Sequence, residues 1–62
     1  MKIYKSAKDN ATLKAYKYAK MYCVRVEYSD GTVLIGQYPT ADGANKLFQG
    51  AKKKHPDLHL VK

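Results

Sequence analysis

Positively charged side chains are the residues of this sequence with the clearest potential for chemistry. Twelve Lys and Arg residues stand against five Asp and Glu, which gives the 62-residue chain a formal net charge of +7. Such an excess attracts polyanions, whether nucleic acid or an acidic protein surface. Arg25 is the only arginine, and lysine suits phosphate contacts better than the reading of guanine edges. Binding with little sequence preference is expected, unless the lysines only keep a small protein soluble.

The lysines form groups along the chain that two predicted helices would gather into patches. A helix over residues 9–20 would place three of them on one arc, and a second helix would carry a lysine run in its last turn. In that last turn, lysines also complement the helix dipole, so the run can serve stability alone. The candidate partner-binding residues are Lys14, Lys17, Lys20, Arg25, Lys46, Lys52, Lys53, Lys54, Tyr16 and Tyr38.

Six tyrosines interleave with the lysines, an arrangement that single-strand nucleic-acid sites use for base stacking. Tyr22 and Tyr28 fall on the apolar side of a predicted hairpin, and Tyr18 on the apolar arc of the first helix, so these three are expected in the core. Tyr16 and Tyr38 lie off those faces. They are therefore the tyrosines expected to contact a partner.

Groups able to do catalysis or bind a metal are few. His55 and His59 are separated by Pro56, which breaks any helix that would turn both rings to one metal ion. Cys23 is the only cysteine, so it forms no intrachain disulfide, and no base is placed beside it. We expect no enzyme activity, no metal and no cofactor, although a ribonuclease using His55 or His59 as a base is a third alternative.

The length of the chain limits it to one basic domain, residues 1–62. So small a core leaves little room for an enclosed pocket, which favours recognition on the surface. No stretch has the continuous apolar character of a signal peptide or a membrane span. A soluble cytoplasmic protein is expected, as a monomer or a weak homodimer.

A β-hairpin is the clearest predicted element. Residues 21–28 and 32–38 are rich in Val, Ile and Tyr and flank Asp30-Gly31, which predicts a two-residue type I′ turn. That loop length pairs Val26 with Ile35. The predicted core face then consists of Tyr22, Val24, Val26, Tyr28, Val33 and Ile35.

A helix is predicted after the hairpin, with Thr40 as its N-cap and Pro56 ending it. Its apolar stripe, which includes Leu47 and Phe48, should lie across the hairpin. Residues 58–61 read as a short closing strand.

The first twenty residues are ambiguous. Residues 1–4 could form a strand, and a helix over residues 9–20 is preferred, although neither Gly nor Pro separates it from the hairpin. The expected class is α+β: an antiparallel hairpin packed on a helix, with a short C-terminal strand and an N-terminal strand or helix. A compact βαββαβ order would be ferredoxin-like.

Residues 22–55 resemble the strand, turn, strand and helix of AP2-type and integrase arm-type DNA-binding domains. The matching residues are Val24, Val26, Gly36, Tyr38, Thr40, Ala44 and Ala51. Small phage host-takeover proteins show similar strings. The first resemblance implies DNA binding, although the AP2 family reads DNA with Arg and Trp on its sheet and this chain has one Arg and no Trp.

The leading functional prediction is therefore a non-enzymatic nucleic-acid-binding protein that holds phosphates through lysine patches. The alternative is a small phage-type inhibitor that docks on an acidic surface of a host protein or adds a strand to it. The two predictions share the charge argument and differ in the partner.

Overall fold

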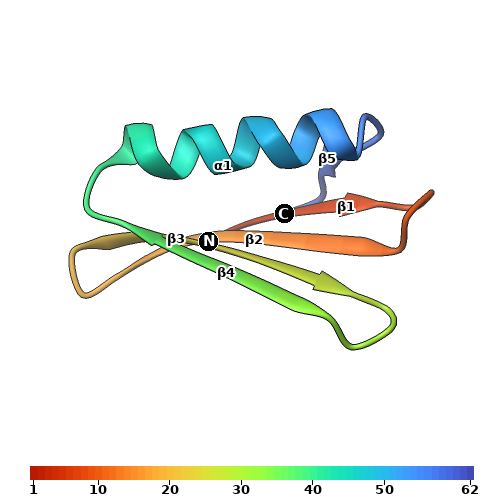
Figure 1. Ribbon diagram of the computed structural model, residues 1–62, viewed down its shortest axis with the longest axis horizontal. Coiled ribbons are helices and arrows are strands. Elements are labelled where there is room, and N and C mark those ends of the chain that lie inside the picture. Colours follow the sequence, from red (N-terminus) through yellow and green to blue (C-terminus); the bar gives the residue numbers. More distant parts are fainter.

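The computed structural model describes residues 1–62 as a five-stranded antiparallel sheet with one helix on it (Figure 1). The elements are β1 (Lys2–Ser6), β2 (Ala11–Tyr18), β3 (Met21–Tyr28), β4 (Val33–Tyr38), α1 (Ala41–Lys54) and β5 (His59–Leu60). The sheet order is β4-β3-β2-β1-β5. Four strands thus form a meander, and α1 carries the chain back across the sheet to pair β5 with β1. The α+β class, with a hairpin packed on a helix and a short closing strand, is confirmed.

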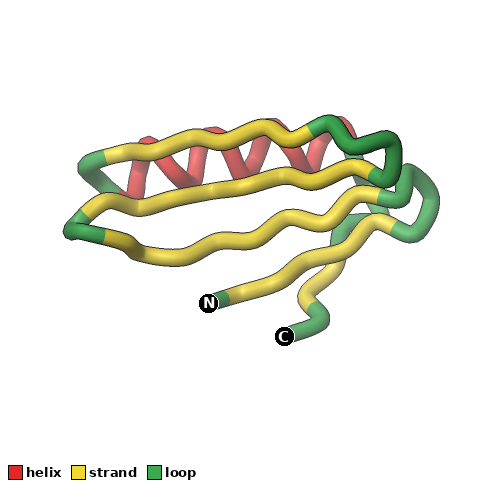
Figure 2. Tube along the Cα trace, turned by 90° about the horizontal axis from the view of Figure 1, so that it is seen from below, coloured by secondary structure: helices red, strands yellow, loops and turns green.

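The helix lies on one face of the sheet, where it contacts β3 and β4. Seen from the other side, the strands lie in front and α1 is visible only behind them, while no element covers the near side (Figure 2). We call this uncovered side the open face. Alternation along the strands and the register between them assign to it Ile3, Lys5, Thr12, Lys14, Tyr16, Tyr18, Met21, Cys23, Arg25, Glu27, Val33, Ile35, Gln37 and His59.

The hydrophobic core lies between the sheet and α1. Leu13 is 0% exposed and Val24 is 2% exposed, and both belong to the central strands. The apolar stripe of α1 packs on them, as predicted, and includes Leu47 and Phe48. The predicted N-cap is also confirmed, because the Thr40 hydroxyl accepts a hydrogen bond from the Gly43 N–H at 3.4 Å. Neither α1 nor any other part of the chain forms a helix long and apolar enough to cross a membrane.

The helix predicted over residues 9–20 is wrong, and with it the βαββαβ order. Residues 11–18 form β2, in which Leu13 and Ala15 face the core while Lys14 and Tyr16 face away, a repeat of two rather than 3.6. A two-residue turn at Ala19 and Lys20 joins β2 to β3, with φ of 51° and 64°. Two positive φ values define a type I′ turn, which normally takes Asn and Gly. Ordinary residues occupy it here, so the usual signal for a hairpin is absent.

The predicted turn at Asp30-Gly31 is wrong by one residue. The loop holds three residues: the Gly31 N–H donates to the Tyr28 carbonyl at 3.0 Å, and the Tyr28 N–H donates to the Thr32 carbonyl at 2.9 Å. Only Gly31 has positive φ, at 94°, which is the pattern of a type I turn with a bulge. The extra residue shifts the register, so every side chain of β4 changes face. Val33 and Ile35 therefore leave the predicted core for the open face.

Candidate nucleic-acid interface

Strands β2 and β3 bring cations and aromatic rings together on the open face. Lys14 and Arg25 lie directly opposite each other in the ladder. Tyr16 and then Tyr18 follow Lys14 on the same side of β2, and successive side chains on one face of a strand lie about 7 Å apart. Tyr18 is 69% exposed. The result is a row of one cation and two rings with a second cation beside it.

Glu27 holds the two cations in place. The Lys14 Nζ lies 2.9 Å from Glu27 Oε1, and the Arg25 Nε lies 3.0 Å from Oε2. The Arg25 contact is an ion pair only, because Nε makes no hydrogen bond. The hydrogen bond from Lys14 is the main cause that lowers the pKa of Glu27 below its ordinary value. Both cations keep more than a third of their side chains exposed, so a ligand can reach them.

The first predicted lysine patch does not form. Lys14 lies on the open face, whereas Lys17 lies on the opposite side, with its Nζ 5.1 Å from the centroid of the Tyr22 ring. Lys20 lies in the turn before β3. A helix would have placed the three residues on one side. In a strand, residues an odd number of positions apart, such as Lys14 and Lys17, lie on opposite faces. Lys14 instead gains Arg25 and Tyr16 as neighbours.

The second predicted lysine group lies on α1, across the sheet from Tyr16 and Tyr18. Lys46, Lys52, Lys53 and Lys54 are all exposed there. The run Lys52–Lys54 occupies the last turn, where positive charge offsets the negative end of the helix dipole. Lys54 also lies 5.9 Å from the centroid of the Tyr28 ring. These lysines therefore cannot share one contact surface with the open face.

Two tyrosines exchange the roles that the sequence predicted for them. Tyr38 was expected to contact a partner, but its ring packs between two glycines: a Cβ added at Gly36 or at Gly43 would lie 2.9 Å from it. Tyr18 was expected in the core and is the exposed one. Both errors follow from the helix wrongly assigned to residues 9–20 and from the shifted β4 register. Tyr16 is confirmed as lying off the core face.

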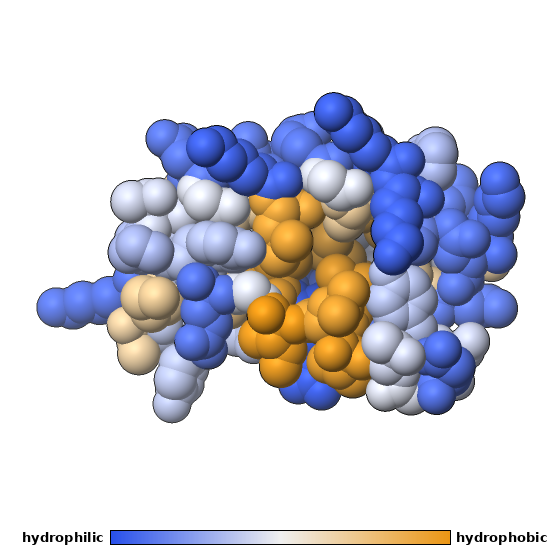
Figure 3. Space-filling view, viewed as in Figure 1, coloured by the Kyte–Doolittle hydropathy of each residue, from blue (hydrophilic) through white to orange (hydrophobic).

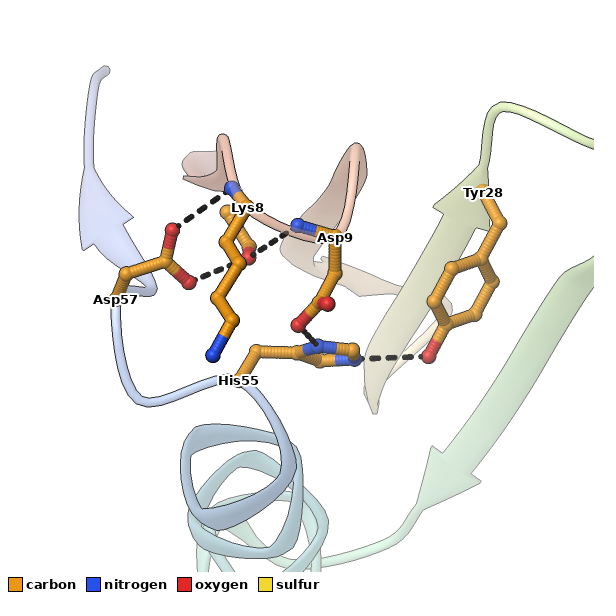
Figure 4. A network of polar contacts seen from close by, with 6 residues as sticks. Lys8, Asp9, Tyr28, His55 and Asp57 are labelled. Atoms are coloured by element: carbon orange, nitrogen blue, oxygen red, sulfur yellow. Dashed lines mark hydrogen bonds and ion pairs between the residues drawn. The ribbon is translucent and has the colours of Figure 1, made fainter.

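A polar network at the far end of α1 was not predicted from the sequence (Figure 4). The buried His55 ring contacts two partners: its Nδ1 lies 2.6 Å from Asp9 Oδ2, and its Nε2 lies 3.0 Å from the Tyr28 hydroxyl. These contacts tie the end of α1 to the β1–β2 loop and to β3. Both ring nitrogens are engaged, so His55 has neither free to take a proton directly from a substrate, as the ribonuclease alternative would need. No three His, Cys, Asp or Glu side chains lie together as metal ligands would.

Comparison with known proteins adds no relative. No family model, curated protein or solved structure matches this chain. The similarity of residues 22–55 to AP2-type domains therefore stays a prediction.

Asp57 anchors the segment after α1 to the β1–β2 loop. The Ser6 hydroxyl donates to one of its carboxylate oxygens, and the Lys8 backbone N–H donates to the other at 3.0 Å. The Ser6 hydrogen bond, followed by that of Lys8, lowers the pKa of Asp57 below its ordinary value. The folded state therefore favours the ionised carboxylate.

We expect the contacts of the Asp57 carboxylate to make the free energy of unfolding fall at acid pH. Because the pKa of Asp57 is lower in the folded state, the stabilisation from its carboxylate is fully present above the unfolded pKa of about 3.9. It is lost as pH falls through the folded-state pKa. Urea unfolding from pH 7 to pH 2 should therefore show a difference in the free energy of unfolding between wild type and Asp57→Asn. This difference should close below about pH 4. When Ser6→Ala is added to both proteins, the difference in their free energies of unfolding should be smaller over the same pH range. Parallel curves for wild type and Asp57→Asn would contradict this origin of the acid sensitivity.

Proposed function

We propose that this protein binds single-stranded nucleic acid on the open face of its sheet. The observation that supports the proposal is the row of Lys14, Tyr16 and Tyr18 on β2, with Arg25 beside it, on the face that no other element covers; Tyr18 is exposed and the other three are half-buried. Single-strand sites combine aromatic rings, on which bases stack, with cations that contact the phosphates between those bases. A contact of this kind has little sequence preference, because every base has a π-face.

Single strands fit the open face better than a duplex. The rings can stack only on bases whose faces are accessible, and in a duplex those faces are covered by neighbouring base pairs. Base-edge readout in a major groove depends largely on arginine, and Arg25 is the only one. We therefore expect a preference for unpaired DNA or RNA.

The lysines on α1 have a different part in this proposal. They lie across the sheet from the rings and add to the overall charge of +7 rather than to the contact itself. Long-range attraction of this kind raises the rate of encounter with a polyanion and weakens with added salt. Lysines on the two faces should consequently differ in how much each one affects affinity.

Fluorescence anisotropy with a labelled single strand, and with its duplex, at two salt concentrations tests the proposal. We expect tighter binding of the single strand and an affinity that falls steeply with salt. Tyr16→Ala and Tyr18→Ala should each weaken binding by roughly fivefold or more, since one stacked base contributes about 1–3 kcal/mol. Lys14→Ala should weaken binding severalfold, whereas the matched change Lys53→Ala on α1 should have a much smaller effect.

In the same experiment, Glu27→Gln should change the affinity in the direction opposite to the alanine variants. It removes the charge that neutralises Lys14 and Arg25, so affinity for the single strand should rise and its salt dependence should steepen. Absent binding at low salt, or equal losses from Lys14→Ala and Lys53→Ala, would contradict the proposed site. Recovery from lysate of one dominant protein that nuclease does not release would favour the acidic-protein alternative instead.

A further inference from the structure

Strand β4 is an exposed edge without the usual protection. It forms one end of the sheet order, and Val33, Leu34 and Ile35 are 40%, 52% and 59% exposed. Natural edge strands are commonly blocked by lysine, proline, a bulge or very short length. The opposite edge, β5, has only two residues. β4 has six residues with no charge and no proline, and the only bulge, at Gly31, lies in the loop before it, so the strand itself is unprotected.

The backbone of β4 can accept another strand. The Tyr28 N–H bonds to the Thr32 carbonyl, and hydrogen-bonded pairs alternate along an antiparallel ladder. The next hydrogen-bonded pairs to β3 are therefore those of Leu34 and Gly36. The N–H and C=O groups of Val33, Ile35 and Gln37 point away from the sheet. No hydrogen bond outside the ladder involves them.

The exposed apolar surface extends from β4 to the flank of α1. Figure 3 shows hydrophobic side chains gathered beneath the helix, over the part of the sheet where β4 runs. On α1, Leu47 points down toward β4, since a Cβ at Gly36 would lie 2.7 Å from its Cδ2. Gly50, one turn further on, would have no atom within 4 Å of an added Cβ. Space is therefore open beside the helix above the exposed strand.

We propose that β4 pairs with β4 of a second copy of this chain, antiparallel and centred on Ile35. The two sheets would join into one ten-stranded sheet with both helices on the same face. This pairing places Val33 against Gln37 of the second copy, and Ile35 against Ile35. All the outward backbone groups of the strand would then be used.

The position of α1 agrees with this arrangement. Neighbouring strands lie about 4.8 Å apart, so a helix over β3 and β4 would lie about 5 Å from a twofold axis between the two β4 strands. The two helices would then be about 10 Å apart, which is a normal distance for packed helices. Gly50 has no side chain on the facing flank, while Lys46 and Lys53, one turn to either side of it, must extend away from the second helix for that approach.

Charge favours a second copy over an acidic peptide at this edge. Each chain carries +7, so two copies repel each other over most of their surfaces. β4 is the one strand longer than two residues without an acidic or basic side chain, so the strand pairing itself brings no charges together, and the repulsion at this contact comes from Lys46 and Lys53 on α1. An acidic peptide would find no cation on β4 itself.

The expected dimer is weak. About ten residues per copy would take part, fewer than the roughly 20–30 per side of a standard interface. Dissociation in the micromolar range is therefore expected, with tighter association at high salt because salt screens the repulsion. This dependence is opposite in sign to that of nucleic-acid binding, and the inference does not rest on the proposed function.

Sedimentation equilibrium over a range of protein concentrations tests the inference on the full chain. Wild type should shift from monomer to dimer as concentration rises, and Ile35→Lys should stay monomeric. Leu60 is 56% exposed on the opposite edge, so Leu60→Lys is a matched control and should dimerise like wild type. A wild type that remains monomeric at millimolar concentration would overturn the proposal, and so would an Ile35→Lys variant that still dimerises.

A cysteine variant tests the register and does not depend on disrupting the fold. Facing residues of antiparallel strands have Cα atoms about 5.5 Å apart, within disulfide range. Ile35→Cys should therefore form a disulfide-linked dimer under mild oxidation, while Leu60→Cys should not. Wild type is the blank, since its Cys23 is buried. Equal cross-linking at both positions would indicate random collision and contradict the pairing.

Discussion

Replacing His55 with alanine is expected to lower the free energy of unfolding by about 3 kcal/mol, through lost packing and lost hydrogen bonds. The ring is 4% exposed and contacts both Asp9 and Tyr28. Its removal leaves a void at the end of α1 and leaves the Tyr28 hydroxyl without its partner. The segments it connects are far apart in sequence, so no local hydrogen bond replaces these contacts.

A loss of this size would remove much of the stability of so short a chain. Stability of about 0.05–0.15 kcal/mol per residue gives a 62-residue protein only about 3–9 kcal/mol in total. Urea unfolding followed by circular dichroism measures the effect. His59→Ala is the control, because that ring is exposed and its change should stay within about 0.5 kcal/mol. Equal effects at the two histidines would contradict the role assigned to the network.

Elements with local signals could be predicted from the sequence. The helix has a capping residue at Thr40, an apolar stripe containing Leu47 and Phe48, and Pro56 beyond its end, and each signal acts within a few residues. Its N-cap and the face it buries are confirmed. The β3–β4 hairpin was predicted from its Val-rich and Ile-rich strands and from Gly31 for the same reason.

Features set by one residue of loop length or by tertiary context were not predictable. Ala19 and Lys20 adopt positive φ without the Asn or Gly that marks such turns, so β2 read as a helix. Gly31 fits both a two-residue and a three-residue loop, and the choice moves Ile35 from the core to the open face. In each case the pairing with neighbouring strands, rather than a local sequence signal, accompanies the observed conformation.

Most residues of the candidate interface were predicted from the sequence, but their arrangement was not. Lys14, Arg25 and Tyr16 were all singled out, but in separate groups, because only the register of β2 with β3 makes them neighbours. Tyr18 was not predicted to contact a partner, because the helix wrongly assigned to residues 9–20 placed it on the apolar arc. Asp9 and His55 could not have been paired, because 46 residues separate them and neither has a motif that points to the other.

The network and the open face belong to different parts of the molecule. His55 and Asp57 hold the end of α1 and the segment after it against the β1–β2 loop, at one end of the sheet. Tyr18 lies at the other end of β2. Variants of the network should therefore change stability with little direct effect on a ligand at Tyr16 and Tyr18, which separates the two kinds of measurement.

The second large effect is expected at Gly43, where alanine should destabilise the protein although it favours helices. Alanine gains up to about 1 kcal/mol over glycine in a helix interior. At Gly43, however, the new Cβ would lie 2.9 Å from Tyr38 Cδ1 and 3.1 Å from Tyr38 Cβ and Cγ. These atoms are at the base of the side chain, and the far end of the ring is held against Gly36, so the ring cannot turn aside. Overpacking of this kind costs about 1–3 kcal/mol, which outweighs the helix preference.

Gly50→Ala is the matched control in the same helix, since a Cβ there meets no atom within 4 Å. It should stabilise the chain by about 0.5–1 kcal/mol, measured at concentrations where the chain is monomeric. In a Tyr38→Ala background the cost of Gly43→Ala should disappear, because the ring that causes it is gone. A Gly43→Ala variant as stable as Gly50→Ala would show that Tyr38 is not clamped between its two glycines. Tyr38 would then again be a candidate for partner contact, as the sequence first indicated.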